Sequence, residues 1–378
     1  MGEPGRSIAV RRLTVAGAVL ITLLAAPPNP GGVAAQGRAA APRGAAAAAR
    51  KPAVSNVAAA PRADGGPFRI TLLGTGNPRP TAERFGPGSL VEAGRHRVLV
   101  DAGRGATIRL FQAGGRELLS GVDLVLLTHL HSDHTVGLPD VWLTGWLFGR
   151  ERPLPVYGPT GTEAMARHLE RAYEFDVANR RDEGEKLPAE GAGLPATDIT
   201  IEQEGAGARV VFDRDGLRIL AFPVDHGPDT PAFGYRFEYE GRTAVFSGDC
   251  RPTPGLIVQA HRADVLVHEV VSPALERRRA LIADPAAIEG IIARHTTAEE
   301  AGRIFALARP RLAVYTHIVP SVATAADLVP ATRKEYRGRL AVGHDLMSIT
   351  IGEKIVLGTR GPQGGRRGRG ASGGATKR

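Results

Sequence analysis

Cysteine is almost absent from this chain. Its 378 residues include one cysteine, Cys250, so an intrachain disulfide cannot form. A disulfide-stapled scaffold is therefore excluded, and a chain of this length can instead be held together by an apolar core. The cysteine content does not assign a cellular compartment, because large domains without disulfides occur both inside and outside cells.

A long apolar run is also missing at the N-terminus. Arg11 and Arg12 precede the apolar stretch Leu13–Ala26, which is short for a membrane-spanning helix. Small residues at 33–35 are typical of a signal-peptide cleavage site. The pattern predicts a signal peptide over residues 1–35 and an exported protein, periplasmic or extracellular, without a stable membrane span after cleavage. The predicted site lies far beyond the apolar stretch, so an uncleaved N-terminal membrane anchor is the alternative.

Large apolar residues are scarce at both ends of the chain. Residues 36–66 consist mainly of Ala, Pro, Gly and Arg, and residues 359–378 are rich in Gly and in basic residues. Such compositions cannot bury enough surface to fold. They predict a disordered linker over 36–66 and a disordered basic tail over 359–378, which leaves 67–358 as the folded domain.

A net positive charge is absent from that folded domain. Residues 1–66 hold eight Lys/Arg against two acids, and residues 359–378 hold six against none. The two ends together therefore carry a net charge of +12. Because the whole chain carries +9, residues 67–358 carry −3. An enzyme that acts on nucleic acid usually has a basic surface on its folded part. The balance disfavours a nucleic-acid partner, although an average can hide a local basic patch.

Strands are abundant in residues 67–358. Val122–Leu127 is a continuous apolar run, typical of a buried strand, and Ala106–Ala113 predicts a helix closed by Gly114-Gly115. Residues 178–208 are charged and interrupted by Gly and Pro, which predicts a surface excursion. Each half of the domain is rich in strands and carries a helix near its end.

Four potential metal ligands directly follow the buried strand, in the order His129, His131, Asp133 and His134. Three imidazoles and a carboxylate at a strand end serve little packing purpose. They suit divalent metal ions, because neutral imidazole and carboxylate are good zinc ligands. A polar loop that is merely rich in His is the alternative, and the H-x-H-x-D-H spacing argues against it. The stretch therefore predicts a pair of divalent metal ions.

Further polar residues follow other predicted strands. They are His226, Asp249, His317 and the pair His268-Glu269. Each one alone is compatible with a hydrogen-bonded structural residue. Together they supply the ligands that a two-metal site at the first motif still lacks.

With these residues in place, the domain resembles the metallo-β-lactamase superfamily, most closely the branch that contains ribonuclease Z and the zinc-dependent arylsulfatases. The motifs that carry the resemblance are Leu72-Leu73-Gly74-Thr75-Gly76, Leu99-Val100-Asp101-Ala102-Gly103, Leu154-Pro155-Val156-Tyr157-Gly158-Pro159, His268-Glu269 and His295-Thr296-Thr297. The resemblance implies an α+β fold, a four-layer αββα sandwich with the metal site at one rim of the two sheets.

The resemblance also implies two Zn²⁺ ions, with Mn²⁺ or Fe²⁺ as alternatives. The ligands that it implies are His129, His131 and His226 for one ion, Asp133, His134 and His317 for the other, and Asp249 between them. Asp101 is expected to hold a ligand imidazole by a hydrogen bond. Two such ions lower the pKa of a water and stabilise the attacking and leaving oxygens.

Three residues are the candidates for catalysis. Asp133 is placed to orient the nucleophilic water, and His295 to donate a proton to the leaving oxygen. Glu269 is expected to hold the imidazole of His295. A structural role is the alternative for His295, because Thr297–Glu300 is a capping box at a helix start. Both roles are compatible, since a capped helix start is a rigid mount.

These residues predict a binuclear zinc hydrolase that cleaves a phosphate or sulfate ester of a small molecule. A true ribonuclease Z, the tRNA 3′-processing endoribonuclease, is the first alternative. The acidic excursion at 178–208, the apolar run Ile318-Val319-Pro320 and the predicted export argue against it. The resemblance also allows a homodimer.

Other classes share the implied fold. A lactonase or β-lactamase-type hydrolase is a further alternative, although the best-known β-lactamases have Cys where this chain has Asp249. Flavodiiron oxidoreductases have Glu at the position of His131, which disfavours iron redox chemistry. A non-catalytic metal-binding module would be expected to lack a ligand, and none is missing from the pattern.

Overall fold

The computed structural model describes residues 66–201 and 207–361. The predicted signal peptide lies outside these ranges, as do the predicted linker except Gly66 and most of the predicted tail. The last strand runs to Thr359, and the Arg360 guanidinium pairs with Glu92 at 3.1 Å. No helix in the described ranges is long and apolar enough to cross a membrane.

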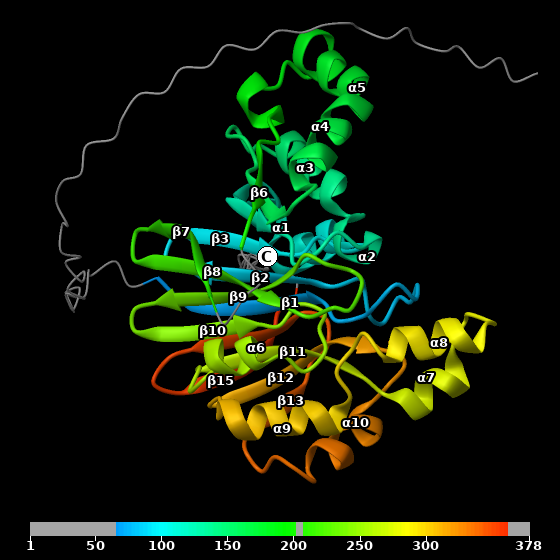
Figure 1. Cartoon of the computed structure of the whole chain (residues 1–378). Coiled ribbons are helices and arrows are strands. Elements are labelled where there is room, and N and C mark those ends of the chain that lie inside the picture. The colour runs from blue at the N-terminus through cyan, green and yellow to red at the C-terminus, as the bar shows by residue number, and fades with distance from the viewer. Residues whose placement is uncertain (1–65, 202–206, 362–378) are drawn as a thin grey trace, which may run out of the picture. The chain divides into compact units, whose positions relative to one another are not determined.

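The described residues form two β-sheets (Figure 1). The first sheet has the order β15-β14-β1-β2-β3-β4-β5-β6, and the second has the order β13-β12-β11-β10-β9-β8-β7. The strands of the first sheet are β1 (Phe68–Gly74), β2 (Gly88–Ala93), β3 (His96–Val100), β4 (Leu124–Leu126), β5 (Val156–Pro159), β6 (Ala196–Ile199), β14 (Met347–Ile351) and β15 (Ile355–Thr359). Those of the second are β7 (Arg209–Arg214), β8 (Leu217–Val224), β9 (Ala232–Tyr239), β10 (Arg242–Phe246), β11 (Val265–Val271), β12 (Leu312–Val319) and β13 (Leu340–Val342). The C-terminal hairpin β14–β15 thus completes the sheet that the N-terminal half begins.

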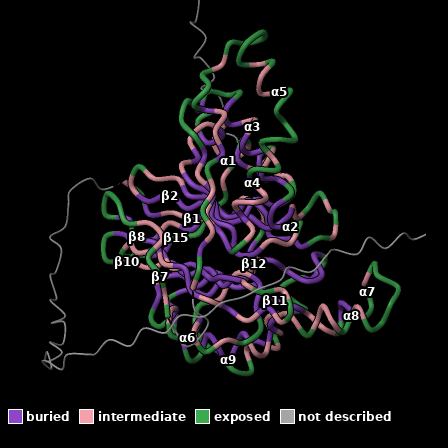
Figure 2. Tube along the Cα trace, turned by 45° about the horizontal axis from the view of Figure 1, so that its top comes forward, coloured by how far each residue is buried: buried purple, intermediate pink, exposed green. Residues whose placement is uncertain are grey.

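Side chains along each strand point alternately to the two faces of its sheet, which produces the layers of the fold. Leu126 belongs to the core between the two sheets, whereas its neighbour Leu127 packs on the opposite face of the first sheet. In the second sheet, Val314 faces the inner core and Tyr315 faces the outer one. Figure 2 shows the buried strands of both sheets enclosed by partly exposed helices. The predicted αββα sandwich of the α+β class is confirmed.

Helices cover the outer face of each sheet. Over the first sheet lie α1 (Ala106–Gly121), α3 (Leu138–Leu147) and α4 (Thr162–Ala172), and over the second lie α6 (Pro254–Gln259), α9 (Ala298–Ala308) and α10 (Ala325–Thr332). The remaining helical segments are α2 (Ser132–Thr135), α5 (Glu174–Ala178), η1 (Asn179–Glu183), η2 (Ala189–Ala192), α7 (Pro273–Arg279) and α8 (Pro285–Ile292).

One local prediction is confirmed and another is refined. The glycines at 114–115 have non-helical dihedral angles and close the first helical segment of α1 as predicted, and Gly115, with a φ of 65°, turns the chain before a second segment continues to Gly121. The excursion at 178–208 is partly structured, since its strand β6 pairs in parallel with β5 and extends the first sheet.

The carboxyl ends of several strands meet at one rim of the sandwich. Strands β3 to β6 run parallel in the first sheet, and β10 to β13 run parallel in the second. Strand β8 runs in the same direction as β10, because both pair antiparallel with β9. The loops that follow β4, β8 and β10 are therefore brought to the same edge.

Candidate metal centre

The first motif occupies the turn after β4 and the short helix α2. Asp101, which follows β3 with a φ of 59°, accepts a hydrogen bond of 2.8 Å from the backbone N–H of Thr128. Its other carboxylate oxygen lies 2.9 Å from His134 Nδ1. The contact expected between Asp101 and a ligand imidazole is present, and it fixes the ring of His134.

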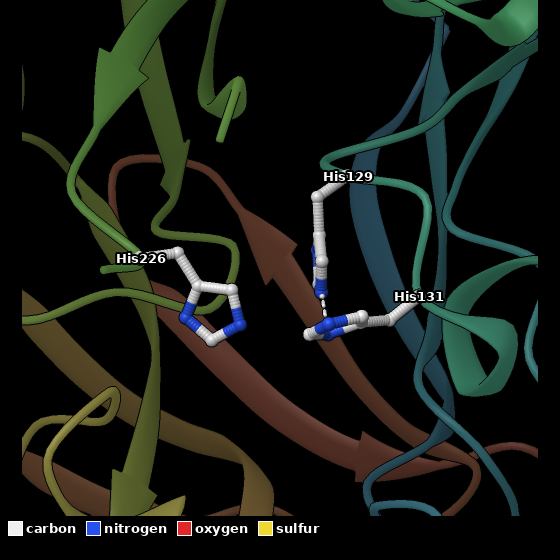
Figure 3. Close-up of side chains that lie close together, drawn as sticks. All are labelled: His129, His131 and His226. Atoms are coloured by element: carbon white, nitrogen blue, oxygen red, sulfur yellow. Dashed lines mark hydrogen bonds between the residues drawn. The ribbon is translucent and has the colours of Figure 1, made fainter. Parts of the chain in front are cut away.

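Three histidines form the first group of candidate ligands. Ligand atoms of His129, His131 and His226 all lie within 4.8 Å of one another. Figure 3 shows His226 facing the other two rings from the opposite side, with His129 Nε2 and His131 Nδ1 2.9 Å apart. His226 Nδ1 lies 3.1 Å from the carbonyl oxygen of Arg294, which leaves Nε2 free for a ligand role.

Asp133, His134 and His317 form a second group within the same distance limit. Asp249 joins the two groups, because one of its carboxylate oxygens lies 3.3 Å from His134 Nε2, 3.1 Å from His317 Nε2 and 3.9 Å from His129 Nε2. The structure thus brings together all seven ligand residues that the sequence predicts. Their assignment to individual ions stays a prediction.

Buried polar atoms that form no hydrogen bond indicate whether these residues suit a metal ion. Among residues 66–201 and 207–361, His134 Nε2 and Asp249 Oδ1 are buried and form no hydrogen bond, although His134 Nε2 lies 3.3 Å from the other oxygen of Asp249. Such burial is costly unless another group satisfies the atoms. Imidazole nitrogen and carboxylate oxygen are the donors that zinc and similar divalent cations take. The donor set therefore fits divalent metal ions.

The electrostatics of the cluster agree with this assignment. Burial and the neighbouring imidazole of His134 hold the pKa of His129 well below its ordinary value, so its ring stays neutral and keeps a lone pair for a metal. Burial opposes ionisation of Asp249, but the rings of His317 and His134 hold its pKa well below the usual range. Burial lowers the pKa of His134, but the surrounding carboxylates, Asp249 first, raise it well above normal. These surroundings favour a positive charge, which a bound cation supplies.

His295 lies beside this cluster and in contact with Glu269. Its Nδ1 is 3.2 Å from Glu269 Oε1, which also accepts hydrogen bonds from the backbone N–H groups of Cys250 and Thr296. Burial lowers the pKa of His295, but Glu269 and nearby carboxylates raise it to about 9. The next residue but one, Thr297, forms the predicted capping box with Glu300. The imidazole is therefore rigidly mounted and protonated at neutral pH.

The structure adds a further candidate role for His295, that of a metal ligand. Its ring stacks on that of His317 with centroids 5.4 Å apart, and it can join Asp249 and His317 in a metal-holding group. A general acid and a metal ligand would both use this position. The catalytic roles of Asp133, His295 and Glu269 stay predictions.

The sequence analysis placed three of these residues after strands, but the structure places them inside strands. His268 and Glu269 belong to β11, and His317 belongs to β12. The β11–β12 register shifts between His268 and Val270, and His317 has a φ of 39°. A bulge redirects side chains toward the rim while the strand continues, which the pattern of apolar residues does not reveal.

Sequence reasoning missed Asp229 and Arg294. Asp229 Oδ1 lies 3.5 Å from His131 Nε2, and its other oxygen pairs with Arg294 Nη1 at 2.7 Å. A carboxylate behind a ligand imidazole orients the ring and raises its basicity. No motif surrounds either residue, so only the fold reveals that they meet.

The metal centre forms the floor of a cleft of about 310 Å³. The floor residues are His131, Asp133, His226, Asp249, His295 and His317. The wall consists of the loop 77–80, of residues on α7, α8 and the turn between them, and of Val319 and Pro320. A cleft of this size takes a group about as large as one nucleotide.

Comparisons with known proteins identify the family. Residues 96–318 match the model of the beta-lactamase superfamily domain. Ribonuclease Z from Mycolicibacterium paratuberculosis is 36% identical over 291 residues, covering 75% of this chain and 98% of the relative. Ribonuclease Z from Mycobacterium marinum is 36% identical over 293 residues, covering 75% and 99%.

Solved structures agree on the fold. The short form of human tRNase Z matches with a TM-score of 0.55 at 22% identity, over 75% of this chain and 100% of that one. The metallo-β-lactamase fold protein YhfI from Bacillus subtilis matches with a TM-score of 0.53 at 20% identity, over 78% and 100%.

The named relatives favour the ribonuclease Z alternative over the phosphate or sulfate ester reading that the sequence analysis preferred. They give no support to a sulfate ester. They reverse a ranking that rested on the charge balance, the excursion at 178–208, the apolar run at 318–320 and the predicted export. By sequence and by fold, this chain belongs to the metallo-β-lactamase superfamily and is a ribonuclease Z-like metallo-hydrolase.

Proposed function

We propose that this protein is a metal-dependent endoribonuclease of the ribonuclease Z type, which cleaves precursor tRNA at its 3′ side. The observation that carries the proposal is the 36% identity to a ribonuclease Z over 98% of that relative's length. The rim of the sandwich supports it, because the residues expected for phosphodiester hydrolysis meet there without a gap in the set.

We propose two Zn²⁺ ions as the bound metals, with Mn²⁺ and Fe²⁺ as alternatives. His129, His131 and His226 would hold one ion, Asp133, His134 and His317 the other, and Asp249 would contact both. Divalent ions in such a site supply Lewis acidity and lower the pKa of a water to near neutral.

The protein's own side chains supply the remaining steps. Asp133 Oδ2 lies 3.2 Å from His317 Nε2 and faces the cleft, where it orients the attacking water. His295, kept protonated by Glu269, donates its proton to the leaving 3′ oxygen. The same imidazolium stabilises charge that develops on the phosphoryl oxygens.

Two arginines at the cleft form a local basic patch, which the average charge of the domain did not reveal. Arg79 and Arg279 line the cleft, and neither guanidinium pairs with a carboxylate in the described part of the chain. Arg79 donates to the carbonyl oxygen of Arg279 at 2.9 Å, so both sit at the same side of the mouth. Unpaired guanidinium groups at this position suit the phosphates of an RNA backbone.

The segment α5–η1 favours a second candidate function. Its cations are neutralised internally, since Arg180 pairs with Asp176 and Glu185, and Arg181 pairs with Asp182. Such a segment offers little free positive charge to a folded tRNA. The second candidate is therefore a phosphodiesterase that acts on shorter substrates outside the cytoplasm, in line with the predicted signal peptide. Export, an N-terminal anchor and a homodimer stay predictions.

Turnover of four substrates by the metal-loaded chain tests the proposal. They are precursor tRNA, a short single-stranded RNA, bis(p-nitrophenyl) phosphate and p-nitrophenyl sulfate. The proposal expects a single cleavage site in precursor tRNA and loss of activity in chelator. Cleavage of the short substrates without cleavage of precursor tRNA would select the second candidate.

A further inference from the structure

One carboxylate in the cleft has no partner. Glu276 lies on α7, is 7% exposed and lines the same cleft as the metal-ligand residues. Its carboxylate forms no hydrogen bond or ion pair with any residue in 66–201 or 207–361. The residue as a whole is nearly buried, yet its carboxylate oxygens are not among the fully enclosed polar atoms, so they can be reached from the cleft.

Two charged groups that line the cleft lie near Glu276. Burial raises its pKa, while the guanidinium of Arg79 and the imidazole of His295 lower it. Both of these neighbours line the cleft, yet neither comes within ion-pair distance of the carboxylate. The oxygens of Glu276 therefore keep free lone pairs in the space between the metal floor and the mouth.

Apolar side chains stand next to this carboxylate. Leu281 and Ile282, on the turn between α7 and α8, are 69% and 46% exposed although they line a cleft. Ile291 of α8 and Pro78 of the facing loop continue the apolar surface. Figure 1 shows α7 and α8 side by side as one projecting unit, and Arg277 on α7 pairs with Glu289 on α8 at 2.6 Å. The unit is thus a built wall that leaves apolar surface open to a ligand.

A flat group with hydrogen-bond donors at its edge fits this combination. The apolar wall packs against its face, the carboxylate accepts from its edge, and Arg79 with Arg279 can hold a phosphate attached to it. A nucleobase has this form, and proteins read single-stranded RNA by packing against base faces and bonding base edges. Carboxylates accept in particular from exposed amino groups, as Glu and Asp do from cytosine N4.

We propose that Glu276 and the α7–α8 wall form a subsite for the nucleobase next to the scissile phosphodiester, with preference for a base that carries an amino group. The proposal rests on the proposed ribonuclease function. It adds which nucleobases the enzyme prefers beside the bond that it cleaves. Cytosine, adenine and guanine present an amino group to the carboxylate. Uracil has no amino group, and the two carbonyl oxygens that flank its N3–H repel the carboxylate.

Precursor tRNAs that differ only in the nucleotide on either side of the cleavage site are the probes. The wild-type chain should cleave the amino-bearing bases about tenfold more efficiently than uracil at one of the two positions, as measured by kcat/KM. Glu276→Ala should reduce that preference to less than about threefold. Glu276→Gln adds an N–H donor that suits a uracil carbonyl, so it should raise the relative rate for uracil.

Two controls separate recognition from folding. Glu353→Gln makes the same carboxylate-to-amide change at an exposed position of the β14–β15 turn, outside the cleft lining, and should leave base preference unchanged. Metal content and turnover of bis(p-nitrophenyl) phosphate, which has no hydrogen-bonding base edge, show that each of the three variants is folded and metal-loaded.

The outcomes distinguish the two proposals. Cleavage of RNA with an unchanged base preference in Glu276→Ala, or with no preference in the wild type, would overturn the subsite and leave the ribonuclease function intact. Turnover of bis(p-nitrophenyl) phosphate without cleavage of any RNA would overturn the ribonuclease function, and the subsite with it.

Discussion

The floor and the wall of the cleft are built in opposite ways. Floor residues contact one another, as where His317 lies 3.1 Å from Asp249 and 3.2 Å from Asp133. The wall exposes Leu281 and leaves the carboxylate of Glu276 without a partner. Floor groups are held in place whichever substrate binds, whereas wall groups gain contacts only from a substrate. The floor therefore sets the chemistry, and the wall sets the selectivity.

The largest expected effect lies in the floor. Asp249→Ala removes the one carboxylate that lies close to both ligand groups, so metal content should fall at both positions. Activity on every phosphodiester should drop by roughly 10³-fold or more, as on removal of the metals by a chelator. Elemental analysis and turnover measure the two effects. Asp215→Asn, an exposed carboxylate in the β7–β8 turn, is the control, and full zinc content in Asp249→Ala would contradict the ligand set.

His295→Ala tests the proton donor of the floor. Loss of a general acid should lower kcat by about 10²–10⁴-fold while metal content stays constant. The loss should be smaller for a p-nitrophenolate leaving group, which needs little protonation, than for an RNA 3′ oxygen. Loss of one metal from this variant would instead make His295 a ligand, as its place near Asp249 and His317 also allows.

A smaller effect is expected from Asp229, which lies next to the ring of the ligand His131. Asp229→Asn removes the charge that faces His131 Nε2 and should weaken zinc affinity by about 10- to 100-fold, with kcat restored at saturating zinc. Competition with a chromogenic chelator measures the affinity. Asp225→Asn is the matched control, because Asp225 pairs with Arg251 and not with a ligand ring. Equal zinc affinity in the two variants would reduce Asp229 to a surface partner of Arg294.

The smallest effect is expected in the wall. Leu281→Ser removes apolar surface that a substrate would cover, so kcat/KM for RNA should fall about fivefold, with no change for bis(p-nitrophenyl) phosphate. Leu307→Ser, an equally exposed site on α9, should change neither rate. An equal fall for both substrates in Leu281→Ser would show that the wall also shapes the floor.

The floor could be predicted well from the sequence, because its chemistry is local. His129 to His134 lie within six positions after an apolar strand, and their types alone point to metal. The two packed sheets were implied by the family resemblance that these motifs carry. Bulges escaped this reasoning, so Glu269 and His317 were placed after strands that in fact run through them.

The wall could not be predicted in the same way. Glu276, Leu281 and Arg79 are distant in sequence or lack a motif, and they become a cleft only when α7 packs beside the 77–80 loop. Net charge misled for a related reason. An average of −3 over the domain cannot show that two arginines without a carboxylate partner lie together at the cleft.

The most direct test of the account is the mapping of cleavage in a precursor tRNA by the intact, zinc-loaded chain near physiological salt. The account predicts one cut at the 3′ side of the tRNA, abolished by chelator and reduced by about 10²–10⁴-fold in His295→Ala. Intact precursor tRNA beside rapid turnover of bis(p-nitrophenyl) phosphate would contradict it, because the floor would then be active without a wall that accepts this RNA.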